Sequence, residues 1–142
     1  MIYWFTGQPS AGKTTLANLL KIEKPDAFRI DGDDMRELFS NKDYSIKGRV
    51  DNVSTAQRIA QYLHNQGKDV IVSLVSPYID QREDFKVIMG DNIKEIYVHC
   101  NDIREKDHFK SIAYVPPYEN FIDINTTFDS IPESFEKLLN AI

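Results

Sequence analysis

The chain has 142 residues and a net charge of −5, with 17 Lys and Arg against 22 Asp and Glu. This length suits one domain with a single core, and the acidic balance argues against a general coat for DNA or RNA, which needs a basic face. No apolar run approaches the roughly 20 residues that span a bilayer. Cys100 is the only cysteine, which excludes an internal disulfide and a cysteine zinc cluster. We therefore expect a globular protein of a reducing compartment, the cytoplasm, that binds neither nucleic acid nor membrane.

Short apolar runs alternate with amphipathic stretches along the chain. In chain order the pattern predicts a strand at 2–5, a helix from 14, a strand at 28–30, helices at 34–39 and 50–65, a strand at 70–75, a helix at 79–89, strands at 93–99 and 121–124, and a helix after Ser130. Strands that alternate with helices indicate a parallel sheet covered on both faces. The sequence predicts one α/β domain over residues 1–142, with three α/β/α layers around a parallel five-stranded sheet.

A glycine-rich loop follows the first expected strand. Its sequence, Gly7-Gln8-Pro9-Ser10-Ala11-Gly12-Lys13-Thr14, fits G-x-x-x-x-G-K-[ST] at every fixed position. Inward-pointing N–H groups and the helix N-terminus can hold phosphates there. Lys13, expected to be a surface charge in the empty protein, would reach the β and γ phosphates, and Thr14 would offer a hydroxyl to Mg²⁺. The sequence therefore predicts an ATP site at 7–15, Thr15 included, on a P-loop NTPase fold.

Two acids follow the second expected strand. Ligands in such folds lie beyond the carboxyl ends of the strands, so we expect Asp31 and Asp33 beside the phosphate loop. Carboxylates there can orient an acceptor hydroxyl and hold Mg²⁺. The strand at 70–75 ends in Ser76-Pro77-Tyr78 without an acid, and no guanine motif is present, which favours a kinase over a GTPase or motor ATPase. In a purely structural interpretation, Asp33 or Asp34 caps the short helix.

Five segments, in this order, resemble the adenylylsulfate kinase (APS kinase) family. They are the phosphate loop at 7–15, Asp31-Gly32-Asp33-Asp34-Met35-Arg36, Arg49-Val50-Asp51-Asn52, Val75-Ser76-Pro77-Tyr78 followed by Arg82, and Pro117-Tyr118-Glu119-Asn120. The family uses MgATP to phosphorylate the 3′-hydroxyl of adenosine 5′-phosphosulfate (APS), giving the sulfate donor PAPS. The resemblance implies the same reaction here, in sulfate assimilation, with ATP and Mg²⁺ as cofactors. Members of the family often dimerise, so a homodimer is expected.

The resemblance also implies roles for individual side chains. Asp31 and Asp33 would orient the acceptor hydroxyl and support Mg²⁺, with Asp33 as the main metal ligand beside Thr14. Arg36, Arg49 and Asn52 would bind the phosphosulfate group, and a planar guanidinium suits such oxyanions. Further acceptor contacts are implied for Tyr44, stacked on the base, and for Ser76 and Pro77, which would line the pocket.

The lid departs from the family pattern. The family has a long basic segment after the fourth strand, with an Asp-Pro-Lys-Gly-Leu-Tyr-type stretch, whereas this chain has a short lid at about 101–114 without that signature. Arg104, Lys106 and Lys110 are the candidates for positive charge at the transferring phosphoryl group, and Phe109 for the second aromatic. This leaves two alternatives open: a same-fold kinase acting on another nucleotide, a sugar or a phosphoramidate, and a nucleotide-binding relative without turnover.

Overall fold

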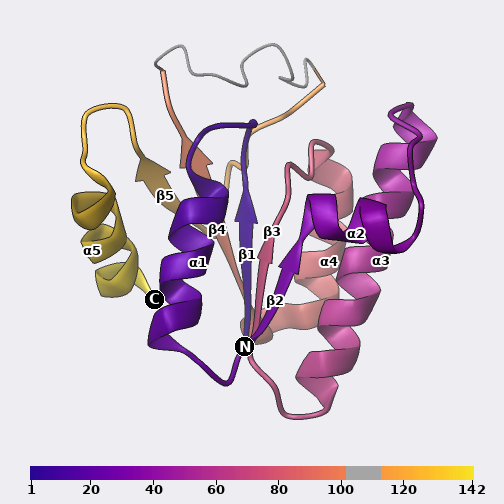
Figure 1. Ribbon diagram of the computed structural model, residues 1–142, viewed down its shortest axis with the longest axis horizontal. Coiled ribbons are helices and arrows are strands. Elements are labelled where there is room, and N and C mark those ends of the chain that lie inside the picture. The colour runs from indigo at the N-terminus through magenta and orange to yellow at the C-terminus, as the bar shows by residue number, and fades with distance from the viewer. Residues whose placement is uncertain (102–112) are drawn as a thin grey trace.

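The computed structural model describes residues 1–101 and 113–142. Its elements are β1 (Ile2–Thr6), α1 (Lys13–Glu23), β2 (Phe28–Asp31), α2 (Gly32–Leu38), α3 (Ile46–Asn65), β3 (Val70–Ser73), α4 (Ile79–Met89), the 3₁₀ turn η1 (Gly90–Asn92), β4 (Ile93–His99), β5 (Phe121–Asn125) and α5 (Ile131–Ala141). The strands form one sheet in the order β2-β3-β1-β4-β5, and every neighbouring pair is parallel. Helices cover both faces (Figure 1), which confirms the predicted three-layer α/β/α fold with a parallel five-stranded sheet.

Each face of the sheet has its own apolar core. In β1, Ile2 and Trp4 point into the cluster under α3 and α4, whereas Tyr3 and Phe5 point into the cluster under α1 and α5. Side chains of successive strand residues alternate between faces, so a strand covered on both sides must be apolar throughout. This accounts for the unbroken apolar runs in the sequence.

Helix α3 begins at Ile46, earlier than the expected residue 50. The side chain of Ser45 accepts a hydrogen bond from the backbone N–H of Gly48 and caps the helix. A Cβ at Gly48 would lie 2.0 Å from the carbonyl oxygen of Asp43, so the chain can fold closely over this turn only with glycine there. The expected start was wrong because a cap, rather than apolar periodicity, defines the end of the helix.

The carboxyl ends of the parallel strands meet at one edge of the sheet, at the top of Figure 1. The loop after β1, helix α2 after β2, the turn after β3 and the segment after β5 all start from this edge. The amino-terminal end of α3 extends past the sheet toward the same side (Figure 1). Among the described helices, none is long and apolar enough to cross a membrane.

Candidate active site

The phosphate loop joins β1 to α1 in a sharp turn. Gly7 has a φ of 147° and Gly12 a φ of 111°, a region that favours glycine. A Cβ at Gly7 would lie 2.1 Å from the carbonyl oxygen of Val98 in β4. The first glycine of the motif is therefore required for the loop to pass this close to the neighbouring strand.

Lys13 bends back over the phosphate loop. Its Nζ donates to the carbonyl oxygen of Gln8 at 2.8 Å, and the residue is only 8% exposed. The surface charge expected from the sequence is wrong, because the loop encloses the lysine stem. The hydroxyl of Thr126, from the segment after β5, donates to the carbonyl oxygen of Ala11 at 2.7 Å and holds the far side of the loop.

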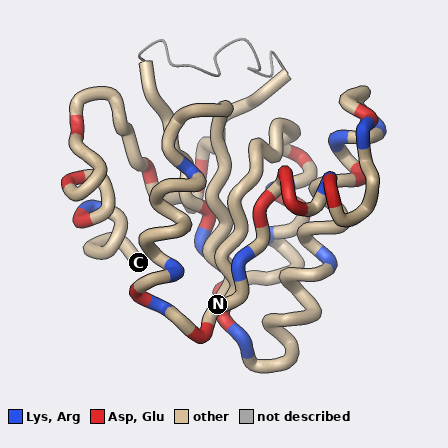
Figure 2. The backbone as a smooth tube through the Cα atoms, viewed as in Figure 1, with Lys and Arg blue, Asp and Glu red and all other residues tan. Residues whose placement is uncertain are grey.

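Asp31 is the N-cap of α2. Its Oδ1 accepts from the backbone N–H of Asp33 at 3.0 Å. The alternative that Asp33 or Asp34 caps this helix is therefore wrong: both lie in its first turn, with exposed side chains. Figure 2 shows acidic residues following one another where β2 runs into α2. Negative charge is favourable at this end of a helix.

The other carboxylate oxygen of Asp31 faces the phosphate loop. Oδ2 accepts from the hydroxyl of Ser73 at 2.9 Å and lies 3.5 Å from the hydroxyl of Thr14. Arg29 donates to the hydroxyl of Ser73 at 2.7 Å and lies 3.7 Å from Asp31. Burial lowers the pKa of Arg29, and Asp31 counters part of that effect.

The oxygens of Thr14 and Asp31 fit the donor set that Mg²⁺ prefers. Mg²⁺ usually takes one or two protein oxygens and completes its shell with water and phosphate oxygens. Over the described ranges 1–101 and 113–142, no group of three or more His, Cys, Asp or Glu could hold a metal ion.

Arg36 organises the turn between α2 and α3. One of its guanidinium nitrogens donates to the carbonyl oxygen and Oδ1 of Asn41, both at 3.1 Å, and to the carbonyl oxygen of Asp43 at 3.0 Å. The guanidinium carbon lies 4.0 Å from the centre of the Tyr44 ring. Tyr44 is 65% exposed, so the stacked pair presents an aromatic surface to solvent at the end of α2.

The start of α3 places two further predicted residues beside α2. Asn52 is buried, and its Nδ2 donates to the carbonyl oxygen of Gly32 at 3.4 Å. Arg49 lies three residues earlier on the same helix, a spacing that puts both side chains on one side. Arg36 thus lies on α2, and Arg49 and Asn52 lie near the start of α3, the helix that follows it.

The turn after β3 (residues 74–78) contains Ser76 and Pro77, the residues that the resemblance implies for the acceptor, and is called here the acceptor loop. Ser76 has a φ of 49°, unusual for a residue other than glycine, and is almost fully buried. Its hydroxyl accepts from the indole N–H of Trp4 at 3.1 Å. Because that hydroxyl is held by Trp4, the backbone around Ser76 and Pro77 is the part that can line a pocket.

Tyr114, the last residue of the predicted lid range 101–114, lies beside the end of β1. Its hydroxyl lies 3.0 Å from the hydroxyl of Thr6, the last residue of β1, and its ring stacks on Tyr97 with centroids 6.0 Å apart. Burial raises the pKa of Tyr114 well above its ordinary value. The lid candidates Arg104, Lys106, Phe109 and Lys110 lie outside the described residues.

Sequence reasoning missed several residues that shape the site. The sequence predicts no site role for Ser73, Trp4 or Thr126. Each nevertheless bonds to a segment at the carboxyl edge of the sheet: Ser73 to Asp31, Trp4 to Ser76 and Thr126 to Ala11. Glu95 of β4 was missed as well. It is 2% exposed and pairs with Arg82, but its neighbour Lys94 is also charged, so the sequence of the strand does not single it out.

Residues 1–115 match the family model described as adenylylsulphate kinase. The chain belongs to the adenylylsulphate kinase family. It is therefore a P-loop phosphotransferase, and the resemblance to this family is confirmed; the match spans the first four of the five sequence segments and ends before Pro117.

Relatives within this family carry more than one name. The chain is 28% identical over 141 residues to the cytidine diphosphoramidate kinase of Campylobacter jejuni, covering 94% of this chain and 82% of that one. It is 26% identical over 165 residues to the adenylyl-sulfate kinase of Staphylococcus epidermidis, covering 99% and 83%. The structure of the Mycobacterium tuberculosis APS kinase in complex with AMPPNP and APS matches with a TM-score of 0.80 at 22% identity, covering 98% of this chain and 95% of that chain. That likeness supports the P-loop NTPase fold.

Proposed function

We propose that this protein uses ATP to phosphorylate the 3′-hydroxyl of APS, giving PAPS and ADP. The observation that carries the proposal is the contact between the two halves of the site. The Thr14 hydroxyl on the phosphate loop lies 3.5 Å from Asp31, which starts the acidic turn before α2. Donor phosphates on the loop and an acceptor hydroxyl at the turn would thus be held side by side, as phosphoryl transfer requires.

The donor half consists of residues 7–15. Backbone N–H groups and the N-terminus of α1 would bind the phosphates, and Lys13 would place its charge on the transferring group. Thr14 and Asp31 offer oxygens to Mg²⁺, which when bound neutralises phosphate charge. The carboxylate of Asp33 is exposed and is not the helix cap, which leaves it as our candidate to accept the proton of the acceptor hydroxyl.

The acceptor half lies between α2, the start of α3 and the acceptor loop. Arg36 and Arg49 would bind the phosphosulfate, since a guanidinium fork matches an oxyanion in shape and charge. The Asn52 amide, which already donates to Gly32, would also hold the acidic turn at a fixed distance from that group. Tyr44, backed by Arg36, offers its ring for the base.

Cytidine diphosphoramidate is a second candidate acceptor. The Campylobacter jejuni relative is named for it, and its alignment of 141 positions is shorter than the 165 positions of the Staphylococcus epidermidis alignment. The alignment with the Staphylococcus epidermidis adenylyl-sulfate kinase spans 165 positions, more than this chain has, so that relative contains residues that this chain lacks. Both acceptors join a nucleoside to an anionic group that Arg36 and Arg49 could bind.

A competition experiment separates these acceptors. Purified protein is given MgATP with APS, with cytidine diphosphoramidate, and with an equimolar mixture, and the products are separated by mass. The proposal predicts the higher kcat/KM for APS. A higher kcat/KM for the cytidine compound would transfer the function to the second candidate, and acceptor-independent ADP release would exclude both.

Three further proposals concern the compartment, the pathway and the oligomeric state. We propose that the protein acts as a single kinase domain in the cytoplasm, in sulfate assimilation, and forms a homodimer as its family members often do. Sedimentation velocity across a range of protein concentrations tests the dimer: a species of twice the 16.4 kDa chain mass is expected. A monomer at every concentration would contradict it.

A further inference from the structure

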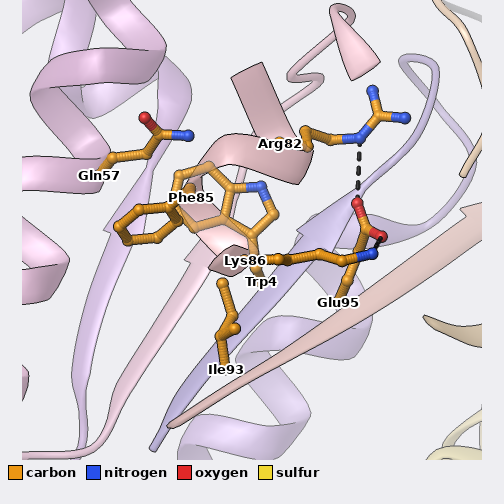
Figure 3. A pocket seen from close by; sticks show the side chains of 7 residues that line it. All are labelled: Trp4, Gln57, Arg82, Phe85, Lys86, Ile93 and Glu95. Carbon is orange, nitrogen blue, oxygen red and sulfur yellow. Dashed lines mark hydrogen bonds and ion pairs between the residues drawn. The ribbon is translucent and has the colours of Figure 1, made fainter. Parts of the chain in front are cut away.

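Helix α4 and strand β4 share a network of buried charges under the acceptor loop (Figure 3). Arg82 is 3% exposed and Glu95 is 2% exposed, and the Arg82 Nε donates to Oε2 of Glu95 at 3.0 Å. Lys86 donates to the other carboxylate oxygen, Oε1, at 2.9 Å. Burial alone would lower the pKa of Lys86, but its hydrogen bonds to Glu95 and Glu83 together raise it. Both oxygens of Glu95 thus have cationic donors.

The guanidinium of Arg82 continues from this ion pair to two separate backbone segments. One terminal nitrogen donates to the carbonyl oxygen of Ser76 at 2.6 Å, in the acceptor loop. The other donates to the carbonyl oxygen of Val115, and the guanidinium lies 5.1 Å from the centre of the Tyr114 ring. Three donors in one rigid plane therefore fix β4, the acceptor loop and the segment 113–119 relative to one another.

Other contacts join the same two segments. The backbone N–H of Val115 donates to the carbonyl oxygen of Pro77 at 3.0 Å, and Lys86 donates to the carbonyl oxygen of Glu119 at 2.9 Å. Ser76 keeps its left-handed backbone while its carbonyl oxygen is held by Arg82. Backbone strain of this kind persists only where the surroundings over-determine it, and it gathers at functional sites.

Stability alone does not account for this arrangement. Well-packed apolar side chains often replace a buried ion pair at no loss of stability, so the pair is weak support for a purely structural role. An apolar side chain could not bond to the carbonyl oxygens of Ser76 and Val115. What only arginine supplies at this position is the simultaneous bond to three partners.

We infer that Arg82 is a positioning residue for the acceptor. It holds the acceptor loop in its left-handed turn and ties the segment 113–119 to that loop, so that the backbone lining the acceptor pocket keeps one geometry. The kinetic consequence rests on the proposed function, whereas the geometric link between the two segments does not.

The geometric link is tested by amide hydrogen exchange on the Arg82→Lys variant. Lysine keeps the charge for Glu95 but cannot reach all three partners at once. Exchange is expected to become faster in 74–78 and 113–119 together. The matched control is Glu83→Gln, which removes a partner of Lys86 on the same helix and leaves the bonds of Arg82 in place. Unchanged protection of both segments in Arg82→Lys would overturn the inference.

Steady-state kinetics test the consequence for the acceptor. In Arg82→Lys we expect the KM for the acceptor to rise about tenfold, because the acceptor loop loses a charged hydrogen bond that holds its geometry, while the KM for ATP changes by less than about twofold. An equal change in both constants, or in neither, would contradict the positioning role. Should Arg82→Lys fail to fold, Glu95→Gln weakens the same network and gives the same two readouts. If the wild type phosphorylates neither APS nor cytidine diphosphoramidate, the proposed function fails, and hydrogen exchange alone decides the link.

Discussion

The hydroxyl of Thr14 lies 3.5 Å from Oδ2 of Asp31, although Thr14 is on α1, which follows β1, and β3 separates β1 from β2, the strand of Asp31. Ser73, at the end of β3, bridges the gap by donating to the same oxygen at 2.9 Å. The first turn of the phosphate-binding helix and the acidic turn after β2 therefore meet over the end of β3. This convergence joins the donor half of the site to the acceptor half.

Replacing Asp31 or Asp33 by Asn should have different effects on stability. Asp33→Asn removes an exposed carboxylate that is not the helix cap, so melting should shift little while kcat falls by about 10²-fold or more. Asp31→Asn keeps a capping oxygen but weakens the contacts to Ser73 and Arg29, so it should lose activity and about 1 kcal/mol of stability. Thermal melting and kcat are measured on both variants. Near-normal turnover in Asp33→Asn would move the catalytic role to Asp31.

Lys13→Ala should abolish turnover, because no other side chain of the phosphate-loop motif carries a positive charge to the transferring phosphoryl group. Lys13 is 8% exposed and bonded to Gln8, so a modest loss of melting temperature should accompany the loss of activity. The control is Lys21→Ala, on the last turn of the same helix. Retained turnover in a folded Lys13→Ala protein would refute the assignment of the phosphate loop.

Arg36→Ala and Arg49→Ala should weaken the binding of APS far more than the binding of ATP. Each lost charged hydrogen bond is worth on the order of 1.5–3 kcal/mol, or about tenfold to a hundredfold in affinity. Arg36→Ala should also free the turn that holds Tyr44, and so should have the larger effect of the two. Isothermal titration of each ligand measures this, with Arg58→Ala, exposed further along α3, as control. Equal losses of affinity for ATP and for APS would mean that these arginines bind ATP, the phosphate donor.

Stability should fall in alkaline solution, partly through Tyr114. Burial raises the pKa of Tyr114, whereas the phenol of an unfolded chain ionises near its ordinary 10.0. Above that pH the folded state binds more protons than the unfolded state, so stability that is complete below pH 10 is lost as the pH rises, by about 1.4 kcal/mol per unit. Urea unfolding from about pH 9 to 11 should show a steeper decline for the wild type than for Tyr114→Phe. Identical slopes would mean that Tyr114 ionises normally in the folded protein.

Local sequence rules were sufficient for the phosphate loop and for the succession of strands and helices along the chain. Position 7 must be glycine because the loop passes so close to Val98. Strand β1 must be apolar throughout because it is buried on both faces. Both requirements can be seen in the sequence itself. The cap of α2 could not be assigned, because Asp31, Asp33 and Asp34 are all good capping residues and the choice depends on where β2 ends. Here β2 includes Asp31, which therefore becomes the cap.

The network around Arg82 could not be predicted from the sequence, for a different reason. Its partners come from β4, the turn after β3 and the segment after residue 112, and no periodicity links those places in the chain. Trp4 and Ser76 likewise meet only because β1 and β3 are neighbours in the sheet. Pairings of this kind follow from topology, so they become visible only when the fold is known.

The proposed transfer of phosphate to APS is tested most directly by identifying the product. The protein is incubated with ATP, Mg²⁺ and APS, and the position of the new phosphate is determined by tandem mass spectrometry. We predict a 3′-phosphorylated APS formed in equal amount to ADP, with ADP release ceasing when APS is withheld. ADP release at the same rate without APS, or no phosphorylated APS at all, would contradict the proposal.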